Sequence, residues 1–159
     1  MPNIRILLVE DEAPKRIHIE RFLTNFSQAI QVNSVYSVNT ALDRLDIEIP
    51  DILLIDMSLP TFDIGEHEGG GRPQGLGGVE ILRYMSMAEI VCPVIVITGY
   101  EAFPRDAGSP VELSQIRQEL LSDFSHLVRG VLHYNSTYDE WKLQLSEALS
   151  ELGFIRSCK

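Results

Sequence analysis

The chain has 159 residues, of which 45% are hydrophobic, and this length suits one globular domain that buries roughly two-thirds of its unfolded surface. Lys and Arg number 13 against 23 Asp and Glu, a net charge of −10 without basic clusters, which argues against nucleic-acid and anionic-membrane partners. No apolar run approaches the roughly 20 residues of a membrane span, the start does not read as a signal peptide, and two cysteines make neither a disulfide framework nor a metal site. We therefore expect a single cytoplasmic domain over residues 1–159.

Short apolar runs alternate with helical patterns along the chain. Strands are predicted at 4–9, 32–36, 52–55, 92–98 and 130–133, and helices follow at 14–26, 39–45, 79–88, 113–124 and 141–152. In the first helix Pro14 falls in the first turn, where proline is tolerated, and the apolar residues that follow recur at helical spacing. Such alternation predicts an α/β fold with a parallel sheet, right-handed crossovers and helices on both faces.

Two connections are longer than the others, at about 61–77 and 99–112. Residues 61 to 78 hold seven of the 11 glycines together with Asp63, Glu66, His67 and Glu68. The glycines complete neither a phosphate-binding nor a dinucleotide-binding motif. An acid–His–acid run can bind a metal, but a solvated loop is the simpler interpretation. The second connection contains Pro104, Gly108 and Pro110, and we expect a loop there as well.

Acidic residues follow two of the predicted strands directly. Glu10 and Asp11 come after the first strand, Asp56 ends the apolar run 52–55, and Thr98 ends the fourth strand. Open α/β sheets build their sites at the carboxyl ends of strands, so we expect these side chains on one edge. Simpler interpretations remain open for single residues, since Asp11 or Glu12 could cap the first helix and Asp56 could merely begin a turn.

Carboxylates gathered on one edge repel one another unless a cation neutralises them. Mg²⁺ favours one or two carboxylates, water and a phosphate oxygen as ligands. With the cation bound, Asp56 can attack phosphorus, because carboxylates form aspartyl-phosphate intermediates. The hydroxyl of Thr98 could then donate a hydrogen bond to a phosphoryl oxygen.

Three segments together resemble the receiver domain of bacterial response regulators, and the likeness runs from Ile4 to about Leu152. They are Val9-Glu-Asp-Glu12, Leu54-Ile-Asp-Met-Ser-Leu-Pro60 and Val96-Ile-Thr-Gly99. The resemblance implies a flavodoxin-like (βα)5 fold of the CheY-like kind, with a five-stranded parallel sheet in the order 2-1-3-4-5.

The same resemblance implies a role for each matching residue. Asp56 corresponds to the phosphoacceptor, and Glu10 and Asp11 correspond to the acidic pair that holds Mg²⁺ with it. Ser58 corresponds to the position whose backbone carbonyl binds the metal, and Thr98 to the switch hydroxyl. Gly78 fits the glycine that opens the third helix.

The chain departs from the receiver pattern around its last strand. Receivers usually carry Lys-Pro there, and the corresponding residues are Tyr134 and Asn135. Tyrosine donates one hydrogen bond but carries no positive charge near neutral pH. The aromatic switch position falls on Val131. Arg129 or His133 could supply the missing charge, although strand alternation makes this speculative.

Three hypotheses follow. In the first, the chain is a stand-alone receiver and no enzyme. It accepts a phosphoryl group on Asp56 from a sensor histidine kinase or phosphotransfer protein, with Mg²⁺ bound. It then signals to a downstream protein by direct contact. In the second, it is a degenerate receiver, an interaction module that ignores phosphorylation; Tyr134 and Val131 favour this and the acids oppose it. The third, a phosphatase with an aspartate nucleophile, lacks the second acid that such enzymes commonly carry two residues later, where Ser58 stands.

Overall fold

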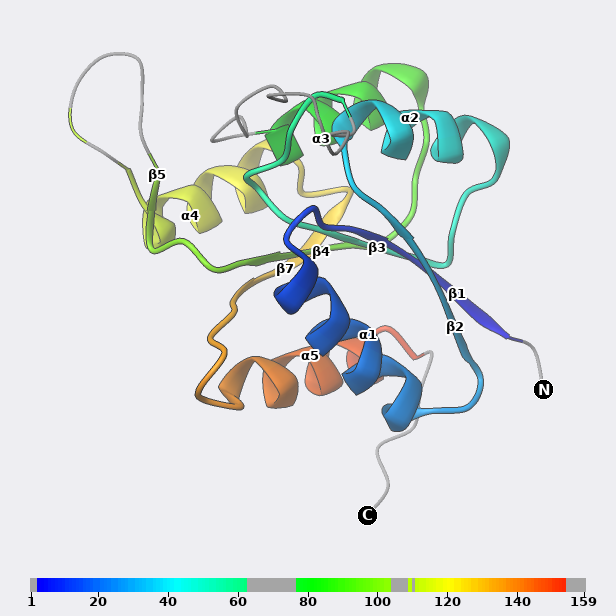
Figure 1. The fold of residues 1–159 in the computed structure, drawn as a ribbon. Coiled ribbons are helices and arrows are strands. Elements are labelled where there is room, and N and C mark those ends of the chain that lie inside the picture. Colours follow the sequence, from blue (N-terminus) through cyan, green and yellow to red (C-terminus); the bar gives the residue numbers. More distant parts are fainter. Residues whose placement is uncertain (1–2, 63–76, 104–108, 110, 154–159) are drawn as a thin grey trace, which may run out of the picture.

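The computed structural model describes residues 3–62, 77–103, 109 and 111–153, and its centre is a five-stranded parallel sheet (Figure 1). The strand order is β2-β1-β3-β4-β7, so the predicted flavodoxin-like order is confirmed with β7 as the fifth strand. The strands are β1 (Ile4–Val9), β2 (Ile30–Val35), β3 (Ile52–Ile55), β4 (Val94–Thr98) and β7 (Val128–His133).

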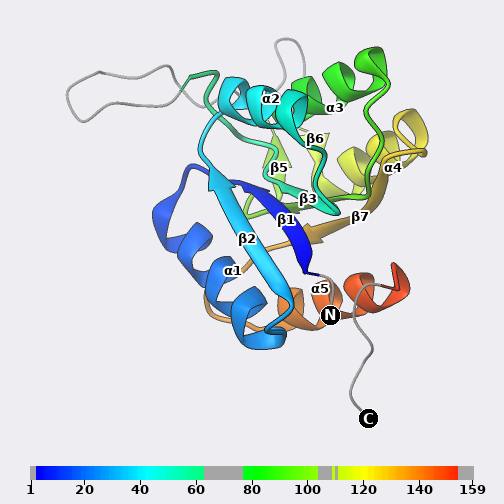
Figure 2. The same cartoon turned by 90° about the vertical axis from the view of Figure 1, so that its right-hand side faces the viewer.

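Five helices cover the two faces of this sheet. Figures 1 and 2 show α1 and α5 on one face and α2, α3 and α4 on the other. The helices are α1 (Ala13–Phe26), α2 (Val38–Ile47), α3 (Gly77–Ala88), α4 (Leu113–Asp123) and α5 (Glu140–Glu151). Among the described residues, none of these helices combines the length and the apolar character needed to cross a bilayer.

Strand β3 shows why the sheet needs helices on both faces. Its four residues have no exposed surface, and their side chains alternate between two cores. Leu53 and Ile55 belong to the core beneath α2, α3 and α4, whereas Ile52 and Leu54 belong to the core beneath α1 and α5. A continuous apolar run is what a strand in this central position requires.

The structure corrects one expectation about the longer connections. The predicted loop at 99–112 contains a short antiparallel pair, β5 (Ala102–Phe103) with β6 (Val111–Glu112). Strands of two residues carry no periodic pattern that a sequence could reveal. The acid–His–acid run at 63–68 lies outside the described residues, as does most of the predicted loop at 61–77.

The start of α3 packs directly against the end of β3. Gly78 donates its N–H to the carbonyl of Met57 at 2.9 Å. A Cβ on Gly78 would lie 2.5 Å from the carbonyl oxygen of Asp56, closer than any real contact. Gly78 therefore lets the helix approach the backbone of the residue that the sequence analysis assigned as phosphoacceptor.

Substitution of Gly78 tests this close approach. We expect Gly78→Ala to lower the free energy of unfolding by about 1–3 kcal/mol, because the new methyl group forces α3 away from β3. Urea denaturation measures the change. Gly130→Ala is the matched control, since nothing lies within 4 Å of a Cβ there. Equal stability of the two variants would contradict the packing argument.

Candidate functional site

The three predicted acids meet at the carboxyl edge of the sheet. Carboxylate oxygens of Glu10, Asp11 and Asp56 all lie within 4.8 Å of one another. Backbone pairing continues just past the strands: Glu10 donates its N–H to Val35 at 3.0 Å, and Asp56 donates to Val9 at 3.1 Å. The parallel register of β1 with β2 and β3 therefore brings the acids together.

Asp56 is held in a defined orientation although it follows a strand end. Only 5% of the residue is exposed, and its Oδ1 accepts the N–H of Met57 at 2.8 Å. Ser58 lies two residues further, in a bend, and is also buried. The bend thus starts directly at the acid cluster, and the hydrogen bond from Met57 orients the carboxylate of Asp56.

Burial disfavours the charged forms of two of these acids. Burial raises the pKa of Glu10, the charge of Asp56 raises it further, and Lys15 opposes both. Burial also raises the pKa of Asp11, again with a contribution from Asp56. The cluster therefore attracts positive charge, since a cation relieves both the loss of solvation and the mutual repulsion.

A residue that the sequence analysis missed, Lys15 in the first turn of α1, supplies one positive charge. The residue is 2% exposed, and its Nζ lies 2.6 Å from Glu10 Oε1 and 3.3 Å from Asp56 Oδ1. A sequence signal did exist: Lys15 precedes Ile19 and Leu23 at intervals of four, and all three are buried. A lysine in the inward register of a helix that starts at the strand ends must face the site.

Thr98 ends β4 and is completely buried. Its Oγ1 accepts the N–H of Tyr100 at 3.3 Å, and its carbonyl accepts the N–H of Tyr134 at 2.7 Å. Thr98 is therefore tied to the segment after β4 and to the segment after β7.

The residues around the last strand, β7, do not take the place of the lysine that receivers usually carry after it. The hydroxyl of Tyr134 lies 2.9 Å from His18 Nδ1 on α1, so it does not point to Asp56. Val131 is buried in β7 beside β4, and Arg129 is exposed. His133 faces Glu101, 3.8 Å away. The buried cation beside Asp56 comes from α1, so the rescue by Arg129 or His133 that the sequence left open is not needed to supply a charge there.

A cleft of about 670 Å³ opens beside Asp56. Its walls come from the start of α1, the segment after β4 and the segment after β7, and they include Lys15, Tyr100 and Tyr134. This volume is within the range of ligand sites, roughly 300–1,000 Å³.

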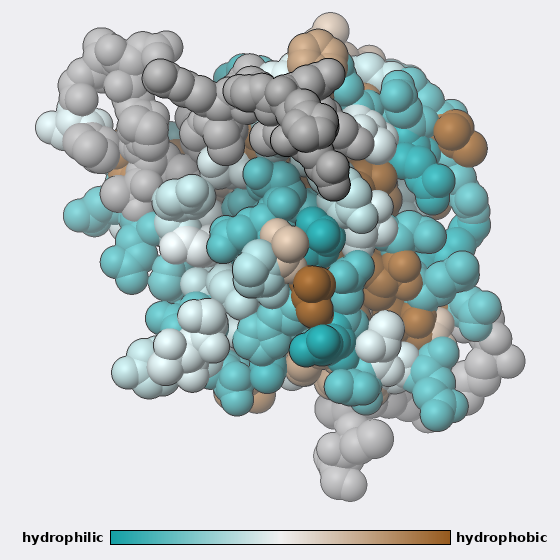
Figure 3. Space-filling view, in the orientation of Figure 1, coloured by the Kyte–Doolittle hydropathy of each residue, from teal (hydrophilic) through white to brown (hydrophobic). Residues whose placement is uncertain are grey.

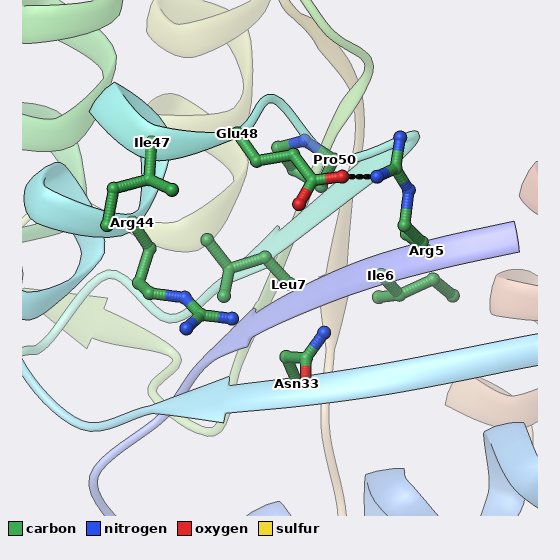
Figure 4. Close-up of a pocket in the computed structure, with 8 residues that line it drawn as sticks. All are labelled: Arg5, Ile6, Leu7, Asn33, Arg44, Ile47, Glu48 and Pro50. Atoms are coloured by element: carbon green, nitrogen blue, oxygen red, sulfur yellow. Dashed lines mark ion pairs between the residues drawn. The ribbon is translucent and has the colours of Figure 1, made fainter.

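A second pocket, near the amino end of β1, holds only about 100 Å³ (Figure 4). It is lined by Arg5 and Glu48, which form an ion pair across its rim, and by Arg44. The pocket is too small for a ligand of ordinary size, and its residues include none of the clustered acids. The face shown in Figure 3 is mostly hydrophilic, with apolar side chains only in scattered spots, so it too marks no competing site.

No family model matches the chain. The chain is 26% identical over 151 residues to the Detocs response regulatory protein DtcB of Enterobacter cloacae, covering 94% of this chain and 100% of that protein. It is 29% identical over 100 residues to sporulation initiation phosphotransferase F of Bacillus subtilis, covering 63% of this chain and 68% of that one.

Solved structures share the fold at lower identity. The response regulator TrrA of Thermotoga maritima, in complex with Mg²⁺ and BeF, matches with a TM-score of 0.60 and 18% identity over 92% of this chain and 99% of that one. A CheY-like receiver domain protein of Methanospirillum hungatei matches with a TM-score of 0.61 and 17% identity, over 95% and 97% of the two chains. The chain thus has a CheY-like receiver fold and resembles response regulators in sequence.

The electrostatics of the cluster lead to a stability prediction. We expect Asp11→Asn, without divalent cations, to raise the free energy of unfolding near pH 7.5 by about 0.5 kcal/mol, a small value because Asp11 is only partly buried. The pKa of Asp11 is raised in the folded state, so its protonated form stabilises the fold at low pH and that stability is lost as pH rises through the folded pKa.

Urea denaturation at several pH values, with a chelator present, measures this difference. The gain should vanish below the ordinary pKa of aspartate, where Asp11 is protonated in folded and unfolded chains alike. Glu147→Gln on the exposed side of α5 is the control and should change little. A loss of stability in Asp11→Asn at pH 7.5 would contradict the argument.

Proposed function

We propose that this chain, which has the fold of CheY-like receivers and resembles response regulators, accepts a phosphoryl group on Asp56 in two-component signalling. The observation that carries the proposal is the convergence of Glu10, Asp11 and Asp56 at the carboxyl edge, with carboxylate oxygens within 4.8 Å. Three acids from two separate strands repel one another in this place, and a need for a bound cation and a phosphoryl group accounts for them.

The carboxylate of Asp56 acts as the nucleophile. Its Oδ1 is engaged by Met57 and Lys15, which fixes the plane of the carboxylate beside the open cleft. A carboxylate needs no general base, so the site must mainly position the phosphodonor and balance its charge. The buried surroundings support this task, because charges there are poorly screened by water.

The acids fit Mg²⁺ in donor type and in charge. Glu10, Asp11 and Asp56 offer only oxygen ligands, which Mg²⁺ prefers, and the backbone carbonyl of Ser58 is the further ligand that the family resemblance suggests. The three carboxylates and the ammonium of Lys15 sum to two negative charges, which one divalent cation balances. When bound, Mg²⁺ supplies charge stabilisation and orientation for phosphoryl transfer.

Thr98 connects the site to the rest of the fold. Its buried hydroxyl accepts the N–H of Tyr100 at present, and it donates to a phosphoryl oxygen when the segment after β4 adjusts. The partners of this cycle are a sensor histidine kinase or phosphotransfer protein as donor and a downstream protein that binds the altered surface. The domain spans residues 1–159, acts in the cytoplasm, and catalyses no reaction beyond its own phosphorylation and dephosphorylation.

Two other functions account less well for the residues of this site. A degenerate receiver without phosphorylation has no use for three converging acids, and the absence of lysine at Tyr134, which favoured that function, is offset by the charge of Lys15. A phosphatase would need a second acid two residues after the nucleophile, where Ser58 stands.

Phosphorylation of Asp56 is tested by intact mass. The wild type, incubated with phosphoramidate and Mg²⁺, should gain one phosphoryl group, and Asp56→Asn should gain none because its amide is not nucleophilic. Asp46→Asn, on the exposed surface of α2, is the control and should behave as the wild type. An adduct of equal yield on Asp56→Asn, or none on the wild type, would exclude the proposal, and continuous phosphate release would favour a phosphatase.

Magnesium binding is tested separately by thermal unfolding. Mg²⁺ should raise the Tm of the wild type, because a ligand that binds only the folded state stabilises it by RT ln(1 + [Mg²⁺]/Kd). The rise should be much smaller in Asp11→Asn, which loses one ligand charge. The experiment is run at constant ionic strength, with Glu147→Gln as control. Equal shifts in Asp11→Asn and the wild type would rule out a magnesium site at these acids.

A further inference from the structure

The most unusual charged side chain in the described structure is that of Lys15. It is 2% exposed, and its ammonium group contacts three other residues. Nζ donates to the carbonyl of Ile97 at 2.8 Å and lies 2.6 Å from Glu10 Oε1 and 3.3 Å from Asp56 Oδ1. One hydrogen bond and two ion-pair contacts therefore hold the ammonium group in place.

Two physical effects oppose a charged lysine at this place. The first turn of a helix carries partial positive charge, which disfavours a cation there. Burial removes the ammonium group from water, at a cost of several kcal/mol unless it is paired. Lys15 is nevertheless tolerated because Glu10 and Asp56 both lie against it. A cation thus lies in contact with Asp56 although both the helix dipole and the loss of solvation disfavour it there.

The position that usually carries this charge in receivers is occupied differently here. Tyr134 stands there, its hydroxyl lies 2.9 Å from His18, and its ring centroid is 5.7 Å from Lys15 Nζ. The ring lines the cleft and flanks the ammonium group without providing a charge. Lys15 instead contacts the carboxylate of Asp56 from α1, the first helix of the chain.

We propose that Lys15 is the residue that pairs with the phosphoryl group on Asp56, in place of the lysine that receivers carry after their last strand. This inference rests on the proposed function. During transfer an oxygen of Asp56 forms a bond to phosphorus while the bond from phosphorus to the donor atom breaks, and the leaving group keeps that electron pair. Lys15 retains Glu10 and Ile97 as partners and exchanges its contact with Asp56 Oδ1 for one with a phosphoryl oxygen.

Charge balance supports this exchange of partners. With Mg²⁺ bound, the unphosphorylated cluster with Lys15 is neutral, since three carboxylates meet three positive charges. Phosphorylation replaces the single charge of Asp56 by up to two on the phosphoryl group. Without Lys15 the phosphorylated site would hold two excess negative charges, and with it only one.

The experiment compares variants that remove, keep or move the charge. Lys15→Met removes it, Lys15→Arg keeps it, and Lys15→Met combined with Tyr134→Lys moves it to the usual receiver position. Lys142→Met is the control, because Lys142 pairs with Asp139 on the surface of α5. Phosphorylation by phosphoramidate is followed by intact mass, with circular dichroism as the check on folding.

We expect Lys15→Met to be phosphorylated roughly a hundredfold more slowly, comparable to the loss of one preorganised donor to a developing charge. The double variant should recover most of the rate, Lys15→Arg part of it, and Lys142→Met should equal the wild type. If Lys15→Met does not fold, the double variant carries the test: a rate near that of the wild type supports the proposal, and a folded double variant without phosphorylation overturns it.

Binding of Mg²⁺ and of beryllofluoride distinguishes this role of Lys15 from a purely structural one. An ion pair that only stabilised the fold would not change both affinities in opposite directions. Trp141 is the single tryptophan and lies 5.2 Å from the ring of Tyr134, so its fluorescence can report both titrations. In Lys15→Met, Mg²⁺ should bind several-fold more tightly because a competing cation is gone. Beryllofluoride, which resembles the phosphoryl group, should bind at least tenfold more weakly because its partner is gone.

The outcomes separate this inference from the proposed function. A wild type that is never phosphorylated contradicts the proposed function itself. A folded Lys15→Met that is phosphorylated as fast as the wild type, or binds beryllofluoride equally well, contradicts only the assignment of Lys15.

Discussion

The contact of one ammonium group with two carboxylates governs the edge where this sheet carries its acids. Lys15 Nζ lies between Glu10 and Asp56, and all three residues are almost completely buried. Each charge alone would be costly in this place, and removing one partner of such a buried pair costs about 3–5 kcal/mol. The start of α1, the end of β1 and the end of β3 are therefore held together by electrostatics as well as by the hydrophobic cores on either face.

The backbone around this contact is arranged so that the charges can meet. Pro14 lies in the first turn of α1, and the next residue, Lys15, is the first buried residue of the helix and lies against the strand ends. On the other side, Gly78 lets α3 approach the carbonyl of Asp56. The carbonyl of Ile97 in β4 accepts a hydrogen bond from Lys15. Three strands and two helices thus contribute to the surroundings of one carboxylate.

The strands and the acidic edge of the sheet could be predicted from the sequence. The role of Lys15 and the direction of the Tyr134 ring could not, for physical reasons. Apolar runs such as Ile52–Ile55 predicted the strands, and acids at their ends predicted the edge, because strand direction and register follow from the α/β alternation. Lys15 was missed because lysine is ordinarily solvated, although its spacing from Ile19 placed it on the buried side of α1. The direction of the Tyr134 ring depends on its packing against His18, which no local pattern reports.

The buried cation beside Asp56 lies on α1 and not after β7, so it connects Asp56 to a different part of the fold. One turn beyond Lys15, His18 contacts both Tyr134 after β7 and Trp141 in α5, with ring centroids 5.7 Å and 5.1 Å away. These aromatic rings are packed edge to face, the arrangement in which aromatic pairs attract one another. Val131, at the usual aromatic switch position, is buried in the other core and has no ring to swing. In this chain the buried cation beside Asp56 is therefore connected to α1 and, through His18 and Tyr134, to the start of α5.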